Sequence, residues 1–156
     1  MQGDAEIIEL LNEVLTAELT AVNQYFIHAK MQQNWGYPRI AHHTRDESID
    51  EMRHAERVIE RILYLEGVPN LQRLWSLRVG ESVPEQIRLD LEVEYEAVAR
   101  LNRCVEAAVA KGDNGSRELF ETILVDEEEH VDWLETQLAA IEAIGEANYL
   151  AQQLYE

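Results

Sequence analysis

The chain has 156 residues, 46% of them hydrophobic, which is enough for a single domain spanning residues 1–156 with a sizeable core. Its formal net charge of −18 argues against nucleic acid and anionic membranes as partners, and it either suits the binding of cations or only aids solubility. We expect a cytoplasmic protein for three reasons. Cys104 is the single cysteine, the acidic N-terminus is unlike a signal peptide, and no long apolar run is present.

Helical periodicity runs through almost the whole chain and is interrupted in only a few places. Asp4 can cap the first helix, the stretch from Trp35 to Pro38 ends it, and Gly145 separates the last two helices. In chain order, the predicted helices span residues 4–34, 40–66, 82–111, 116–144 and 146–155. Residues 67–82 are long enough to run the length of a bundle. Two hairpins joined by such a crossover predict an all-α, ferritin-like four-helix bundle with a short fifth C-terminal helix.

Each long helix carries ionisable residues on its apolar face. Glu18 falls between Leu15 and Val22 in an apolar stripe, and Glu94 takes the equivalent place on the third helix. The other inward positions are Glu51 and His54 on the second helix, and Glu127 and His130 on the fourth. Lone carboxylates in a dry core are costly unless they are paired or bind a metal. Because no Lys or Arg shares these positions, a pair of divalent cations is the expected counter-charge.

The two halves of the chain repeat this pattern. The spacing between the single glutamate and the Glu-x-x-His motif is identical in both halves, from Glu18 to Glu51 and from Glu94 to Glu127. The whole set therefore recurs in the second half at one constant offset. One Glu-x-x-His is a weak signal in a Glu-rich chain, but its repetition on matched helices predicts a pseudo-symmetric site with two bridging glutamates. The alternative is an acidic bundle with inward Glu–His hydrogen bonds.

The ligand types suit iron, manganese or zinc and do not separate them. A bridged pair with open positions suits redox chemistry with oxygen or peroxide. Tyr25 lies two turns after Glu18 on the same face. It either supplies an electron or a hydrogen bond near the metals, or it is simply a core aromatic residue.

Six stretches carry a family resemblance: MQGD (1–4), NQYF (23–26), NWG (34–36), ESIDEMRHA (47–55), LEGVPN (65–70) and DEEEH (126–130). On these stretches the chain resembles the bacterioferritins, the haem-containing ferritins, over essentially its full length. The resemblance implies a homo-oligomeric 24-subunit cage of two-fold dimers, which oxidises Fe(II) with O2 or H2O2 and stores ferric mineral. All six inward residues match the family's ferroxidase ligands, with Glu51 and Glu127 bridging.

The resemblance also implies a b-type haem on each two-fold axis, held by Met52 from each of two subunits. The pattern alone would make Met52 a packing residue, about 100° around the helix from Glu51. Arg45 and Asp46 stand where the family often has an aromatic residue and a histidine, so the edge of the haem pocket is altered. Asp46 and Asp50, one turn apart, are either an iron site on the inner cavity wall or solvated carboxylates.

By the same resemblance, four residues would line an iron entrance pore (Asn34, Glu66, Asp132 and Thr136), and a small ferredoxin would return electrons for iron release. The alternatives are a haem-free ferritin, a di-iron or di-manganese oxidase or peroxidase of rubrerythrin type, and a cage that binds metal passively. The rubrerythrin type is disfavoured because Cys104 is the chain's only cysteine.

Overall fold

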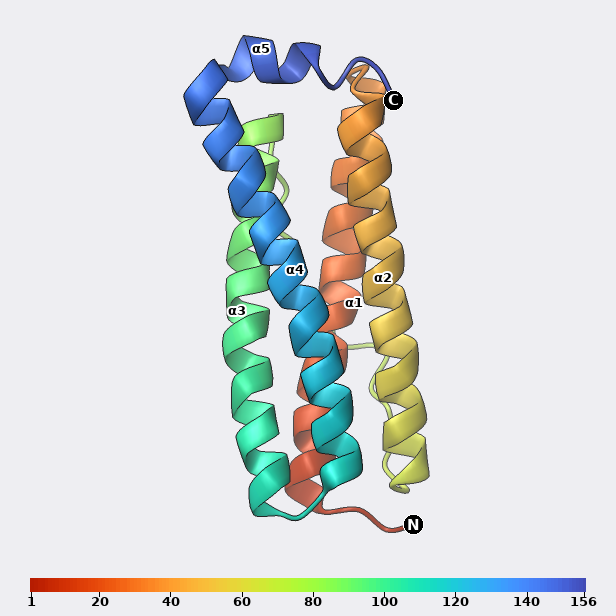
Figure 1. Ribbon diagram of the computed structural model, residues 1–156. Helices are drawn as coiled ribbons and strands as arrows, with labels where there is room; N and C mark the ends of the chain where they lie inside the picture. Colours follow the sequence, from red (N-terminus) through yellow and green to blue (C-terminus); the bar gives the residue numbers. More distant parts are fainter.

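The computed structural model describes all 156 residues and contains five helices and no strand. The helices are α1 (Ala5–Asn34), α2 (Pro38–Tyr64), α3 (Val83–Ala110), α4 (Asn114–Ile144) and α5 (Glu146–Ala151). The first four stand side by side in an elongated bundle, and α5 lies across one end (Figure 1). The predicted all-α bundle of two hairpins is confirmed. None of these helices combines the length and the hydropathy needed to cross a bilayer.

Side-chain caps explain where the helices begin. The Asp4 carboxylate accepts a hydrogen bond of 2.9 Å from the backbone of Glu6, and Asp113 accepts one of 3.0 Å from Ser116. Because Asp113 is the cap, α4 begins at Asn114, two residues before the predicted start. The second helix likewise begins at Pro38 rather than residue 40, since the fixed φ of proline suits a first helical position. The fifth helix was predicted to reach residue 155 but ends at Ala151.

The second helix ends at Tyr64 rather than at the predicted residue 66, and Gly67 is not the residue that turns the chain. The left-handed residue is Glu66, with φ of 63°. Gly67 has another role, because a Cβ on it would lie 2.7 Å from Cγ2 of Ile8 and 3.0 Å from Cγ2 of Ile62. The glycine is therefore required by the close approach of α1 and α2 to this turn.

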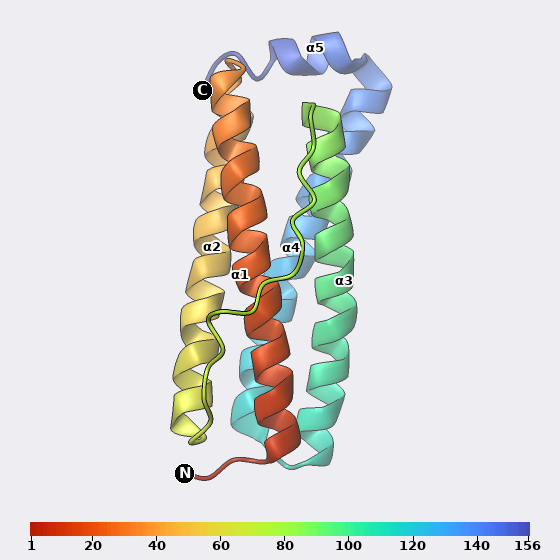
Figure 2. The same ribbon diagram turned by 180° about the vertical axis from the view of Figure 1, so that it is seen from behind.

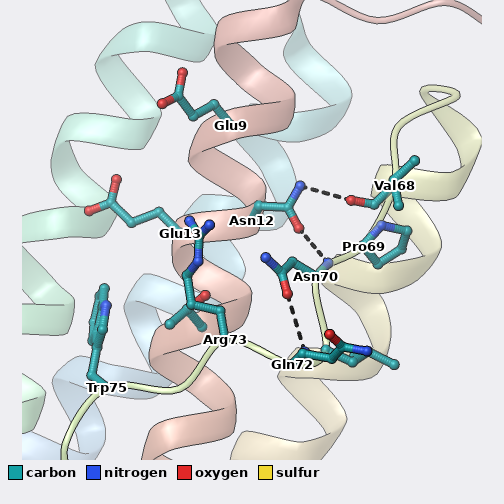
Figure 3. A pocket seen from close by; sticks show the side chains of 11 residues that line it. Glu9, Asn12, Glu13, Val68, Pro69, Asn70, Gln72, Arg73 and Trp75 are labelled. Atoms are coloured by element: carbon teal, nitrogen blue, oxygen red, sulfur yellow. Dashed lines mark hydrogen bonds between the residues drawn. The ribbon is translucent and has the colours of Figure 1, made fainter.

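The crossover between α2 and α3 runs along the outer side of the bundle, first over α2, then across α1 and on to the start of α3 (Figure 2). Its first half is fastened by Asn12, whose amide donates to the carbonyl of Val68 at 3.1 Å and accepts from the backbone of Asn70 at 2.9 Å (Figure 3). A polar hollow of about 800 Å³ remains between α1 and this half of the crossover, and none of the six inward residues lines it.

The core is divided into two apolar clusters, one towards each end of the bundle. The larger includes Leu11, Ile62 and Phe120, and the smaller includes Ile40 and Ile87. On α2, α3 and α4 the inward glutamates and histidines lie in the chain between residues of the two clusters, and on α1 Glu18 follows Leu15, the last α1 residue of the larger cluster. The fold therefore encloses a polar layer between two dry ones.

Candidate metal centre

The structure brings all six inward residues into this polar layer, where each is at most 8% exposed. They come from all four long helices: Glu18 (α1), Glu51 and His54 (α2), Glu94 (α3), Glu127 and His130 (α4). Charged side chains are rarely buried so completely unless they are paired or bind metal.

The six residues form two overlapping groups, each with ligand atoms within 4.8 Å of one another. The first group contains Glu18 and His54, and the second contains Glu94 and His130. Glu51 and Glu127 belong to both groups. Two neighbouring four-ligand sites that share two carboxylates are the geometry of a bridged metal pair.

Both histidines turn the same ring nitrogen towards the centre. Nδ1 of His54 lies 3.2 Å from Oε1 of Glu127, and Nδ1 of His130 lies 3.1 Å from Oε1 of Glu51. Each imidazole therefore approaches a shared glutamate that belongs to the opposite hairpin.

Five buried polar atoms of the cluster have no hydrogen-bond partner: Oε2 of Glu18, Oε1 of Glu51, Nδ1 of His54, Oε2 of Glu94 and Oε1 of Glu127. Orphaned groups of this kind are rare in folded proteins and call for a partner such as an ion. Since four of the five atoms are carboxylate oxygens and the fifth is an imidazole nitrogen, a cation satisfies all of them. The donor set therefore fits iron, manganese or zinc.

Crowding of carboxylates in a dry layer disfavours their charged forms. Burial, reinforced by Glu18 and Glu94, raises the pKa of Glu51 to about 8. Burial and the charge of Glu51 raise the pKa of Glu127 to about 7. Burial likewise raises the pKa of Glu18, and places that of Glu94 well above its usual range.

The two histidines, unlike the glutamates, favour their charged forms. Burial alone would lower the pKa of His54 and of His130, but the close contacts with the surrounding glutamates outweigh it and raise both. The metal-free cluster thus holds protons that bound cations would displace.

The outer nitrogens of the two histidines meet aspartates in a crossed pattern. Nε2 of His54 lies 2.8 Å from Oδ2 of Asp126, whereas Nε2 of His130 lies 3.8 Å from Oδ2 of Asp50. Contacts of this kind fix the orientation of a metal-binding imidazole. Asp126 was not among the predicted site residues, although the internal repeat relates it to Asp50.

A polar opening connects these aspartates with solvent on the α2–α4 side. It has a volume of about 370 Å³, and we call it the vestibule. Its lining contains no hydrophobic residue and consists of Asp50, Arg53, His54, Arg57, Asp126, Glu129 and His130.

Tyr25 lies against the cluster and is fully buried. Its hydroxyl donates a hydrogen bond to Oε1 of Glu94. Burial and the neighbouring carboxylates hold the pKa of Tyr25 well above its usual range, so the hydroxyl keeps its proton. The structure thus gives Tyr25 a contact with a candidate ligand, and its electron-donating role stays a prediction.

The remaining candidates lie outside the cluster. Met52 is 48% exposed on α2, facing away from the six residues. Asp46 is exposed and lines a separate hollow between α2, α4 and α5, so it joins neither ligand group. Asn34 is the last residue of α1 and Glu66 follows the end of α2, and these two helices end at opposite ends of the bundle (Figure 1), so a pore with both residues requires further copies of the chain.

Comparisons with known proteins agree on one family. A family model described as a ferritin-like domain matches residues 8–144. The bacterioferritin of Streptomyces coelicolor is 58% identical over 151 residues, which are 97% of this chain and 90% of that protein. The bacterioferritin of Mycobacterium leprae is 55% identical over 152 residues, covering 97% of this chain and 96% of the relative.

Solved structures give the same result. A mycobacterial bacterioferritin structure superposes with a TM-score of 0.97 at 54% identity, covering 98% of this chain and 95% of the other. The structure of bacterioferritin BfrA from Mycobacterium tuberculosis gives a TM-score of 0.98 at 52% identity, covering 99% and 98%.

Proposed function

The chain belongs to the bacterioferritin family of ferritin-like iron-storage proteins, and from that premise we propose that it oxidises Fe(II) at the six-residue centre and stores the product. The observation that carries this proposal is the pair of four-ligand groups that share Glu51 and Glu127. Two ferrous ions held in this way would react as a pair. The five orphaned atoms support the same assignment because a cation pair would satisfy them.

The proposed reaction takes one electron from each ferrous ion. Dioxygen accepts the two electrons with two protons and becomes hydrogen peroxide. If hydrogen peroxide is the oxidant, the same two electrons and two protons yield two waters. Glu51 and Glu127 would bridge the ions, while Glu18, His54, Glu94 and His130 would each bind one of them. Tyr25 would hold Glu94 in place through its hydroxyl.

The proposed product is a ferric mineral inside a hollow 24-subunit cage built of two-fold dimers. The surface supports self-association, because the first part of the crossover leaves Val68 and Leu71 81% and 57% exposed. Apolar side chains grouped on one segment mark a surface that another protein covers. A native mass near 24 times 18.0 kDa is the expected result.

A b-type haem bound between two copies of the chain is part of the proposal. Met52 fits the role of an axial ligand because its exposed thioether stands on α2, clear of the metal centre. One copy supplies only half of such a site. Haem would supply a route for electrons from a small ferredoxin when stored iron is reduced and released. Because the only cysteine, Cys104, is buried and free, we propose a reducing, cytoplasmic setting.

Stopped-flow oxidation of Fe(II) by dioxygen tests the centre. Glu18→Ala and Glu94→Ala should each abolish the fast phase, whereas Glu106→Ala, which removes an exposed carboxylate from α3, should retain it. An unchanged fast phase in the first two variants would refute the assignment. Oxygen uptake separates the proposal from passive binding, because a cage that only sequesters iron consumes no oxygen.

No observation favours the rubrerythrin-type alternative. An electron-transfer site with cysteine ligands needs several thiolates, and Cys104 is the only cysteine of the chain. Burial also raises the pKa of its thiol to about 12.

A further inference from the structure

A second opening reaches the candidate centre from the side opposite the vestibule. It is a cavity of about 30 Å³ between α1 and α3, beneath the crossover, and we call it the passage. Its floor is formed by Glu18, Glu51 and Glu127. The carboxylates of the centre are therefore approached from two faces of the bundle.

The passage differs from the vestibule in size and in the chemistry of its walls. Ala17, Ala21, Val93 and Ala97 form apolar sides where α1 and α3 face each other. A space of about 10–15 Å³ holds one water molecule, so 30 Å³ admits only a very small guest. The vestibule is more than ten times larger and wholly polar.

The outer end of the passage is closed by Trp75 and Arg100. The guanidinium of Arg100 lies over the indole ring of Trp75, 4.7 Å from its centroid. Nε of Arg100 has no hydrogen-bond acceptor, and its nearest carboxylate oxygen is Oε1 of Glu13 at 3.4 Å. Arg100 is thus paired with Glu13, and Arg78, which also lines the passage, is paired with Glu96, so the narrow apolar sides rather than charge decide what the passage admits.

The crossover is held over the passage by a polar stripe on α1, formed by Thr20, Gln24 and His28 at four-residue spacing. Thr20 accepts the backbone N–H of Trp75 at 3.0 Å, and Gln24 accepts that of Arg78 at 3.0 Å. Between these two points, no hydrogen bond ties the backbone of residues 76 and 77 to the bundle.

His28 completes this attachment. Its Nε2 accepts the backbone N–H of Gly80 at 2.9 Å. Nδ1 must then carry the ring proton and donate it to Oδ1 of Asp90, also at 2.9 Å. The same oxygen of Asp90 accepts from the amide of Gln24. The backbone of the crossover is thus held at residues 75, 78 and 80, and the stacked side chains of Trp75 and Arg100 form the closure of the passage.

We propose that the passage admits dioxygen to the centre while iron uses the vestibule, and that Trp75 and Arg100 form its outer gate. This inference rests on the proposed oxidation of Fe(II). Dioxygen is uncharged, apolar and two atoms long, which suits alanine walls and a cavity of this volume. A ferrous ion with its water shell needs the larger and wholly polar vestibule, where Asp50, Asp126 and Glu129 replace lost hydration although Arg53 and Arg57 share the lining.

Xenon tests the passage without iron, because it is an uncharged apolar atom that serves as a stand-in for dioxygen. Crystals of the metal-free protein under xenon pressure should show xenon between Ala21 and Ala97. Ala97→Val should abolish this density by filling the passage. Ala107→Val, the same change nearer the C-terminal end of α3, should leave the density unchanged. Trp75→Ala should raise the occupancy. Absence of xenon in the wild-type passage, or no rise in Trp75→Ala, overturns the proposal.

Kinetics test the division of routes. Ala97→Val should slow Fe(II) oxidation at limiting dioxygen at least threefold, while anaerobic Co(II) binding, followed by its visible absorption, keeps its wild-type rate. Ala107→Val should change neither rate. Equal slowing of Co(II) binding, or unchanged oxidation, refutes the assignment. If the wild type does not oxidise Fe(II), the proposed function fails, and the xenon experiment still decides whether the passage is open.

Discussion

His54 on α2 reaches across the bundle to Asp126 on α4, with 2.8 Å between Nε2 of the ring and Oδ2 of the carboxylate. This contact turns Nδ1 of His54 towards the shared glutamate Glu127, 3.2 Å away. The corresponding distance from His130 to Asp50 is 3.8 Å, beyond hydrogen-bonding range. The two halves of the centre are therefore alike in composition and unequal in how firmly their histidines are oriented.

The first prediction concerns this orientation. Asp126→Asn should weaken Zn(II) binding about 10- to 100-fold, because it removes the charged acceptor that fixes the His54 ring. Asp50→Asn should have a smaller effect, since its contact is longer. Titration calorimetry measures both. Glu128→Gln removes an exposed charge from the same helix and serves as the control; an equal loss in that variant would point to general electrostatics instead.

The second prediction concerns pH. Glu51 and Glu127 have pKa values of about 8 and about 7, above the usual 4.5, so the metal-free fold favours their protonated forms. The stability they contribute is complete below pH 4.5 and is lost as the pH rises to about 8. The metal-free protein should therefore melt at a lower temperature at pH 8 than at pH 5.

Zn(II) should cancel this loss because the cations replace the protons. The increase in melting temperature on adding Zn(II) should grow across this window by about 2–4 °C for each kcal/mol of lost stability. Scanning calorimetry at several pH values provides the measurement, and Glu51→Gln should flatten the profile. A zinc effect that stays constant or shrinks with rising pH would contradict the prediction.

The third prediction concerns haem. Met52→Leu should assemble normally and lose the haem absorption band after reconstitution, because leucine offers no sulfur ligand. Met31→Leu, a change on α1 at a partly buried methionine, should keep the band. A visible spectrum read together with the native mass distinguishes loss of haem from loss of assembly. A retained band in Met52→Leu would exclude this methionine as the ligand.

The fourth prediction concerns the turn after α2. Gly67→Ala should lower the free energy of unfolding by about 1–3 kcal/mol through overpacking, since the new Cβ meets Cγ2 of Ile8 at 2.7 Å. Ile8→Leu moves the branch away from the β-carbon and should restore part of the loss in the double variant. Denaturant titration tests both steps. If Gly67→Ala is neutral, the turn can shift and the close approach is not required.

The fold was largely predictable because helical periodicity is strong and the breaks are few. The convergence of six side chains was also foreseeable, because Glu-x-x-His recurs at the same offset as the single glutamates, Glu18 and Glu94. Helix ends were harder to place. Because the side chain of Asp113 caps α4, Gly115 lies inside the helix and not in the turn before it. There Gly115 faces the guanidinium of Arg61.

The features that the sequence could not indicate depend on contacts made by the crossover, a segment that has no regular periodicity. The roles of Trp75 and Arg100 come from the path of the crossover over α1 and α3, which no local pattern encodes. Asp126 resembles any exposed helix carboxylate until His54 is seen beside it. The buried positions of Gln24 and His28 likewise gain meaning only when the crossover backbone lies against them.

The sharing of glutamates between the two ligand groups has a mechanical consequence. Helices α1 and α2 form one hairpin and α3 and α4 the other, and each ligand group takes residues from both. Glu127 joins the group of the first hairpin, and Glu51 joins that of the second. Each bound ion would therefore cross-link the two hairpins. Loss of the ions would weaken the contact between the hairpins before either hairpin unfolds.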